Sequence, residues 1–218
     1  MKQEGSTIYV AINSNMPLAG TTVSGQHIGW GDFIMNFGNL NSYNPNDSGL
    51  YAVHFAGSYS DSGVQNNGFY SVTTKSVTSI NLGYNKIQDY LNVVGTYGSL
   101  GGFAYTNGYF DLNAPAQNSI KTGSYISAIN LLNATQLLSF GLDFATGMAV
   151  AAGDLGSQTF GFSFTLPGTL SGNFIAHLAV ECANDMMAFY DTTTSVPEPA
   201  SLIFLLFGLA FAFLRAKK

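Results

Sequence analysis

Short stretches in which polar and apolar residues alternate recur along most of the chain. Alternation with a period of two is typical of antiparallel strands that bury one face. The predicted strands are Thr7 to Ile12, Asp32 to Phe37, Leu50 to Ala56, Phe69 to Ile80, Gln158 to Leu166 and Asn173 to Cys182. From Phe160 to Leu166 every second residue is phenylalanine or leucine, so one face of that strand is wholly apolar. A second sheet is needed to cover this face, and the pattern therefore predicts an all-β domain built as a two-sheet sandwich.

Residues that favour turns separate the predicted strands. Asn67-Gly68 and Asn107-Gly108 are typical of two-residue hairpin turns, because both residue types tolerate positive φ angles. Pro167 to Asn173 predicts a longer connection between two strands. Apolar residues with approximately helical spacing occur only in Ile126 to Leu138. This segment therefore predicts either one short helix or irregular structure. Many short strands with such turns favour a jelly-roll topology for the sandwich, although the pattern leaves the strand order open.

Residues 196–218 have a different pattern. Val196-Pro-Glu-Pro199 is followed by the uncharged, apolar stretch Ala200 to Leu214 and by the basic end Arg215-Ala-Lys-Lys218. Fifteen helical residues span about 22 Å against a bilayer core of about 30 Å, so the stretch predicts a short transmembrane helix. The positive-inside rule places Arg215, Lys217 and Lys218 in the cytoplasm and the preceding domain on the other side. The predicted organisation is a β-sandwich domain at 1–191, a polar linker at 192–195 and this segment at 196–218.

The order of these three parts resembles the PEP-CTERM sorting signal of exosortase-dependent bacterial surface proteins. The resemblance implies that Pro197, Glu198 and Pro199 form the recognition motif. It also implies that Ala200 to Leu214 enters the inner membrane and that Arg215 starts the basic tail. The implied partner is exosortase, a membrane-embedded transpeptidase-like protease. Proteins of this kind are associated with extracellular polysaccharide and the biofilm matrix of Gram-negative bacteria, so the resemblance implies a membrane-anchored precursor that reaches the cell surface or the extracellular space.

Two segments of the body resemble, more weakly, domains that precede such signals. They are Trp30-Gly-Asp-Phe-Ile34 and Ile175 to Asp185. Members of the family normally carry an N-terminal signal peptide. Here the longest apolar run near the start is Ile8 to Ile12, which is shorter than the roughly 7 to 15 residues of a signal-peptide core. We therefore expect either that the natural start lies upstream of Met1 or that this copy is not exported.

Composition narrows the range of partners. Apolar residues make up 46% of the chain and charged residues only 9%, which excludes a disordered chain and leaves serine, threonine and asparagine as the main surface residues. Between Gln3 and Pro199 three lysines stand against all twelve acids, a net charge of −9. Such a field repels phosphate backbones, so nucleic acid is excluded as a partner. The single Cys182 excludes an internal disulfide.

Candidate catalytic residues are scattered along the sequence. His27, His54 and His177 are well separated, and neither a Gly-x-Ser-x-Gly elbow nor a metal-ligand spacing accompanies them. Glu181 and Asp185 lie close to Cys182 and are expected to raise its pKa, which disfavours a nucleophile. We therefore predict a protein that is not an enzyme and has no catalytic residue. A hydrolase with a dispersed site stays open as an alternative, and it requires two carboxylates or a histidine–acid pair that converge in a pocket.

The loops contain residues that suit two kinds of ligand. Oxygen-bearing residues that suit Ca²⁺ are Asn44, Asn46, Asp47, Ser48 and Asp61. Their spacing lacks the EF-hand pattern and such residues also form ordinary turns, so we expect no metal and no other cofactor. Tyrosines in or near loops are Tyr43, Tyr59, Tyr70, Tyr97, Tyr105 and Tyr109. Their rings could stack on sugars, so a carbohydrate-binding module is the alternative to the preferred function, a non-enzymatic surface or extracellular-matrix protein.

Overall fold

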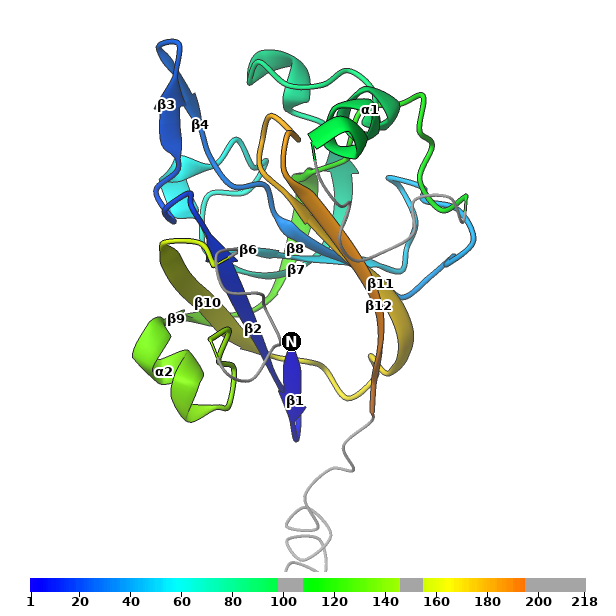
Figure 1. Ribbon diagram of the computed structural model, residues 1–218. Coiled ribbons are helices and arrows are strands. Elements are labelled where there is room, and N and C mark those ends of the chain that lie inside the picture. The colour runs from blue at the N-terminus through cyan, green and yellow to red at the C-terminus, as the bar shows by residue number, and fades with distance from the viewer. Residues whose placement is uncertain (98–107, 146–154, 195–218) are drawn as a thin grey trace, which may run out of the picture.

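The computed structural model describes residues 1–97, 108–145 and 155–194. The fold is mostly β, with 43% strand and 11% helix, in several antiparallel sheets (Figure 1). The predicted all-β class is therefore confirmed. The predicted sorting segment, including the apolar stretch at 200–214, lies outside the described residues. Among the helices of the described ranges, none has the length and apolar character needed to cross a membrane.

One sheet has four antiparallel strands in the order β1, β2, β10, β9. Its strands are β1 (Lys2–Glu4), β2 (Thr7–Ser14), β9 (Ile129–Asn133) and β10 (Gln158–Thr165). Along β2 the buried residues Ile8, Val10 and Ile12 alternate with half-buried ones, as the sequence pattern predicts. β10 pairs with β2 over its whole length, and Phe162 lies opposite Val10. The apolar residues of the two strands therefore form one continuous face.

A second sheet has six antiparallel strands in the order β12, β11, β5, β6, β7, β8. Its strands are β5 (Phe33–Asn36), β6 (Leu50–His54), β7 (Gly68–Lys75), β8 (Ser119–Ser127), β11 (Gly172–Ala179) and β12 (Met186–Thr193). A separate hairpin, β3 (Thr21–Val23) with β4 (Gln26–Ile28), projects at the top of Figure 1. Strands β5 to β8 form a meander, and the β11–β12 hairpin extends it. Long-range pairings join this meander and the smaller sheet to later parts of the chain, because β5 pairs with β11 and β2 pairs with β10.

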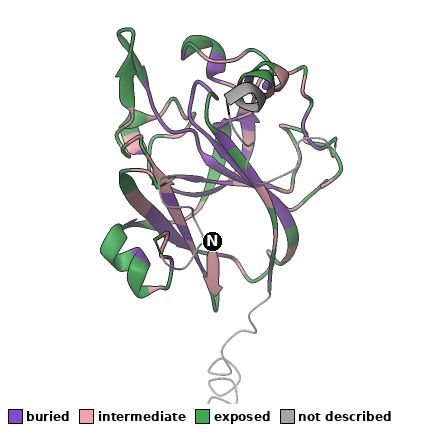
Figure 2. Ribbon diagram, viewed as in Figure 1, coloured by how far each residue is buried: buried purple, intermediate pink, exposed green. Residues whose placement is uncertain are grey.

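The two large sheets share an aromatic core. The ring centroid of Phe162 lies 5.7 Å from that of Phe33 on β5 and 5.1 Å from that of Phe55, which follows β6. Phe164 lies 4.7 Å from Phe69 on β7. All five rings are buried, so the six-stranded sheet covers the apolar face of β10 as predicted. Figure 2 shows the buried residues gathered on the central strands, whereas the β3–β4 hairpin is largely exposed.

In the described ranges two α-helices lie outside the sheets. α1 (Ile87–Tyr97) has no counterpart in the sequence prediction. α2 (Ala134–Ser139) coincides with the second half of the predicted helix, and the first half forms β9 instead. A capping box begins α2, because Oδ1 of Asn133 accepts the N–H of Gln136 while the Gln136 side chain accepts the N–H of Asn133. Single 3₁₀ turns occur at Gly57–Tyr59 and Thr78–Ile80.

Of the predicted turns, the connection after β10 is confirmed and the Asn67-Gly68 hairpin is wrong. Pro167 to Asn173 contains the connection between β10 and β11, as expected. Asn67-Gly68 is not a hairpin turn, because β6 ends at His54 and Gly68 already pairs with His54 as the first residue of β7. A side chain at Gly68 would meet the ring of Tyr125, so packing explains the glycine here. Asn107 lies outside the described residues.

Candidate functional site

The last strand positions the predicted sorting segment. β12 pairs with β11 along its whole length, and its last residue, Thr193, lies opposite Gly172. Thr193 is buried, and the hydroxyl of Thr192 donates a 2.7 Å hydrogen bond to Oδ1 of Asn173. Residues 192 and 193, which the sequence analysis assigns to the polar linker, therefore belong to the sheet. The predicted recognition residues and basic residues lie outside the described chain; they are Pro197, Glu198, Pro199, Arg215, Lys217 and Lys218.

The first strand holds the end of the described chain. Nε2 of Gln3 donates to the carbonyl of Thr194 at 2.9 Å, and Oε1 of Gln3 accepts the N–H of Thr194 at 3.0 Å. Figure 1 shows β1 and the end of β12 at the same lower end of the molecule. Only Ser195 and Val196 separate Thr194 from Pro197 in the sequence. The folded domain therefore extends almost to the predicted recognition motif.

The two body segments singled out by the weaker resemblance are neighbours in the fold. The N–H of Gly31 donates to the carbonyl of Ala179 at 3.0 Å, and the N–H of Glu181 donates to the carbonyl of Gly29 at 3.0 Å. The N–H of Gly29 donates in turn to Oε2 of Glu181 at 2.8 Å. A side chain at Gly31 would overlap the carbonyls of Ala179 and Asn118, so the close approach requires glycine. The segments thus join the start of β5 to the turn after β11.

Asp32 is the centre of a buried polar cluster. Its Oδ1 accepts a 2.7 Å hydrogen bond from Nδ1 of His54, and its Oδ2 accepts from Ser62 Oγ at 2.9 Å and from the N–H of Ile120 at 2.6 Å. The side chains of Asp32 and His54 are only 1% and 0% exposed. This is a histidine–acid pair of the kind that the alternative hydrolase requires. Ser62, however, bonds to Asp32 and not to His54, and solvent does not reach the pair.

Glu181 has a comparable structural role at the junction. Besides the N–H of Gly29, its carboxyl accepts the N–H of Asp61 through Oε1. Burial raises the pKa of Glu181, and the two backbone hydrogen bonds oppose part of that shift. Asp61 is itself held by Asn81, whose Nδ2 donates to its Oδ2 at 2.8 Å. The two carboxyl groups therefore fix loops to each other and do not converge in an open pocket.

The other histidines also have structural environments. Nε2 of His177 donates to the carbonyl of Gln117 at 2.9 Å, and the rings of Tyr43 and Phe110 meet its ring edge-on at 5.3 and 5.4 Å. Burial lowers the pKa of His177 to about 4, against the opposing effect of the hydrogen bond to Gln117. His27 lies on β4, where its Nε2 donates to the carbonyl of Ala19 at 2.9 Å. The structure brings no two of the three histidines together by a hydrogen bond within the described ranges.

Cys182 is enclosed at the turn after β11. Its thiol donates a 2.6 Å hydrogen bond to Oδ1 of Asn184. Burial raises the pKa of the thiol, and the carboxyl groups of Asp185 and Glu181 add to the shift. The expectation that neighbouring acids raise this pKa is confirmed, although burial is the larger cause. A protonated, buried thiol is a packing residue and a poor nucleophile.

The oxygen-bearing residues that suit Ca²⁺ lie in two separate loop regions. Oδ1 of Asp47 accepts the N–H of Gly49 at 2.8 Å, and Oδ2 accepts the N–H of Asn39 at 3.0 Å. Oδ1 of Asn44 accepts the N–H of Asn46 at 3.0 Å, as in an ordinary Asx turn. Asp61 belongs to the separate cluster with Asn81. In the described ranges no three His, Cys, Asp or Glu residues gather in a way that could hold a metal ion.

Three of the six loop tyrosines, namely Tyr43, Tyr70 and Tyr109, do not offer a flat face to a sugar. Tyr109 and Tyr70 are buried, and Tyr70 donates its hydroxyl to the carbonyl of Asn66 at 2.7 Å. Tyr43 packs edge-on against Tyr109 at 5.6 Å, and burial raises the pKa of both hydroxyls. Tyr59 is exposed. The side chain of Tyr97 and all of Tyr105 lie outside the described part of the chain. The described tyrosines therefore form no shared stacking platform, contrary to the carbohydrate-binding argument.

Comparison with known families decides the nature of the segment beyond β12. Residues 195–218 match the family model described as the PEP-CTERM protein-sorting motif. The chain carries a PEP-CTERM sorting motif. This motif supports an exported protein sorted by exosortase and implies processing by that enzyme, and it fits a precursor that is anchored at its C-terminal end and reaches the cell surface. No curated protein and no solved structure matches the chain.

Proposed function

We propose that the chain is a non-enzymatic surface or extracellular-matrix protein whose PEP-CTERM motif delivers a rigid β domain to the cell exterior. The observation that carries this proposal is the position of the motif at 195–218, directly after a strand that is held in the sheet as far as Thr193. Before processing, the apolar stretch at 200–214 anchors the precursor in the inner membrane. The basic residues Arg215, Lys217 and Lys218 then stay on the cytoplasmic side.

Burial of the candidate catalytic groups supports the non-enzymatic part of the proposal. His54, His177 and Cys182 are all less than 10% exposed, and Asp32 is enclosed with His54. A hydrolase needs its base and nucleophile within hydrogen-bond reach of a bound substrate. The hydroxyl nearest to the histidine–acid pair, that of Ser62, is bonded to the acid instead. The cluster is therefore better explained as a structural tie between loops.

A role in the exopolysaccharide or biofilm matrix is the second part of the proposal. The body of the chain has few charges and many serine, threonine and asparagine residues, so its surface can hydrogen-bond to hydrated polysaccharide without strong ionic contacts. The net negative charge of the body keeps copies of the domain soluble after release. Exosortase then acts as the partner that separates the domain from the membrane segment.

Processing can be tested directly with the full chain. The chain, fused to a cleavable secretion signal, is produced in a host with exosortase and in a matched host without it, and the mature C-terminus is determined by mass spectrometry. We expect the Lys218 end to be lost only in the exosortase-positive host. Replacing Pro197 and Pro199 by Ala should abolish this processing, because the prolines hold the motif extended.

The matched control for these variants is Pro167→Ala, which changes a proline in the β10–β11 connection and should leave processing intact. An intact Lys218 end in the exosortase-positive host, or the same trimming in both hosts, would contradict the proposed sorting. The matrix role is tested separately by co-purification of the mature domain with secreted polysaccharide. A domain recovered only as free protein in the culture medium would count against that role.

A further inference from the structure

A cavity opens at the end of the molecule where β2, the β3–β4 hairpin and the turn between β11 and β12 meet. It has a volume of about 580 Å³, within the range of roughly 300–1,000 Å³ that is usual for small-molecule sites. Its floor consists of buried apolar residues, namely Ile12 on β2, Ile28 on β4, Leu178 on β11, Met186 on β12 and the bridged pair Trp30 and Val180. These residues would surround the hydrocarbon part of a ligand.

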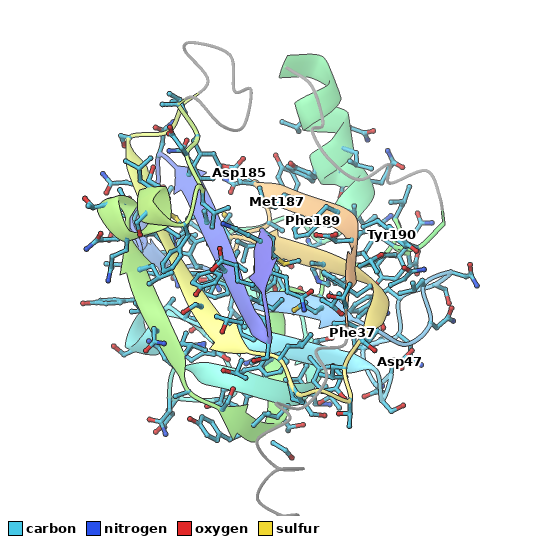
Figure 3. All side chains as sticks on the ribbon, turned by 90° about the horizontal axis from the view of Figure 1, so that it is seen from below. Phe37, Asp47, Asp185, Met187, Phe189 and Tyr190 are labelled. Atoms are coloured by element: carbon cyan, nitrogen blue, oxygen red, sulfur yellow. The ribbon has the colours of Figure 1, made fainter. Side chains whose placement is uncertain are left out.

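The rim of the cavity is also apolar. Val23, Leu82 and Met187 line it and are exposed to 49%, 65% and 51%. They come from the β3–β4 hairpin, from the loop after Ile80 and from β12, so three separate segments place large apolar side chains around one opening. Figure 3 shows Met187 next to Asp185 at the start of β12. Exposed apolar residues gathered at one opening are typical of a binding site.

Backbone strain is concentrated at the same place. In the described ranges three residues other than glycine have positive φ angles: Ser24 at 50°, Leu82 at 56° and Ala183 at 52°. Leu82 lines the cavity, Ser24 follows the lining residue Val23, and Ala183 follows the lining residue Cys182. A left-handed conformation costs such residues about 1–2 kcal/mol each. Strain of this kind persists where the surrounding structure enforces it, and it clusters at ligand sites.

The charge of the cavity selects among ligands. Asp185 is the one charged residue among the described lining residues, and the described lysines Lys2, Lys75, Lys86 and Lys121 do not line it. Asp185 is exposed at the rim, and partial burial of its carboxyl raises its pKa. A carboxylate that has no basic residue beside it among the described lining residues attracts a cation. The other polar side chains that line the cavity are neutral; they are Asn13, Ser14, Asn15, Thr21, Asn81 and Asn184.

We propose that this cavity binds a small apolar amine, with the ammonium group at Asp185 and the hydrocarbon body against Trp30 and the surrounding apolar floor. The site is independent of the sorting motif and of the proposed surface role. An anionic ligand would meet Asp185 without a basic partner, and a neutral ligand would leave the carboxylate without a counter-charge. The cavity is therefore matched to an apolar cation.

The single tryptophan of the chain reports on this site. Trp30 is the only tryptophan, so a change in intrinsic fluorescence arises at the cavity. The full chain, held in lipid nanodiscs, is titrated with 3-cyclohexylpropylamine, and with 3-cyclohexylpropanol and 3-cyclohexylpropanoate as neutral and anionic analogues of the same size. Empty nanodiscs correct for partition into lipid. We expect saturable binding of the amine, about tenfold tighter than that of the alcohol, because one charge-assisted hydrogen bond is gained.

Substitution at the rim tests the assignment of the charge. Asp185→Asn should weaken binding of the amine by about tenfold and leave binding of the alcohol unchanged. The matched control is Asp191→Asn on β12, the strand that follows Asp185, at a residue that does not line the cavity, and it should leave both affinities unchanged. Isothermal titration calorimetry provides a readout that does not depend on Trp30. Equal binding of all three analogues, an unchanged amine affinity in Asp185→Asn, or no saturable binding by either method would overturn the proposal.

Discussion

His177 illustrates how a single buried residue makes the stability of the domain depend on pH. Its ring is enclosed by Tyr43 and Phe110, and burial lowers its pKa to about 4 from an ordinary value near 6.5. In the unfolded chain the imidazole therefore takes up a proton at a higher pH than it does in the folded domain. Proton uptake by the unfolded chain favours unfolding, so the contribution of His177 is fully present above about pH 6.5 and declines as the pH falls toward 4.

We predict that His177→Gln reduces this loss of stability. A glutamine amide can still donate to the carbonyl of Gln117 but does not titrate. Between pH 7 and pH 4.5 the free energy of unfolding of the parent should fall by about 2–3 kcal/mol more than that of the variant, because one pKa unit corresponds to about 1.4 kcal/mol. Urea unfolding at several pH values measures this difference. The raised pKa values of Glu181 and Asp185 act in the opposite direction, but they do so in both proteins. Their contributions therefore cancel in the difference between the parent and the variant.

The control for this experiment is His27→Gln on β4. His27 is exposed, and its hydrogen bond to Ala19 is also one that glutamine can retain. The free energy of unfolding of the His27→Gln protein should change with pH in the same way as that of the parent. If His177→Gln showed the parental course as well, His177 could not be the residue that loses its proton on folding.

At the scale of elements, the sequence predicted the strands that bury one face and missed those at the edges. β2 and β10 alternate clearly because each is paired on both sides and covers the core. β8 is an edge strand with five consecutive exposed residues from Lys121 to Tyr125, and its pairing with β7 is irregular, so its period is lost. α1 contains Val93, Val94 and Gly95, which lower its helix propensity, and it was missed for that reason.

The contacts between elements could be predicted even less well. Asp32 belongs to the segment from Trp30 to Ile34, which resembles domains that precede PEP-CTERM signals. Its hydrogen-bond partners His54, Ser62 and Ile120 lie 22, 30 and 88 residues away in the sequence. Such partners are decided by strand order and register, which a single sequence does not contain. The end of β12 was misassigned for a similar reason, because the sequence Thr192-Thr-Thr194 is polar but finds its partners on β11 and β1.

We predict that Asp32→Asn destabilises the domain by about 3 kcal/mol. Both oxygens of Asp32 accept hydrogen bonds, so an amide at this position turns one donor toward another donor in a buried site. Urea unfolding measures the loss, and we expect no loss beyond about 0.5 kcal/mol for the exposed control Asp89→Asn on α1. Equal stabilities of the two variants would show that the Asp32 cluster does not tie the loops together.

In the molecule as a whole, β12 connects the cavity to the residues that precede the PEP-CTERM segment. The strand begins at the cavity, which Met186 and Met187 line, and it ends at Thr193 next to the PEP-CTERM segment. Eight residues of extended chain span about 26 Å, so the cavity and Thr193, close to the end of the described chain, lie at opposite ends of one strand. The proposed ligand site and the last described residues before the matched motif are therefore separated by the length of β12.

The shared core leads to a last prediction, that both sheets unfold together. Phe162 contacts rings from the opposite sheet and is fully buried, so Phe162→Ala should lower the free energy of unfolding by about 4 kcal/mol. The exposed Leu138→Ala on α2 is the control and should cost less than about 0.5 kcal/mol. Fluorescence of Trp30 and far-UV circular dichroism should give one common urea midpoint in each protein, because the core joins the sheets into a single cooperative unit. Two separate midpoints, or a Phe162→Ala protein as stable as the control, would mean that the sheets are stabilised independently of each other.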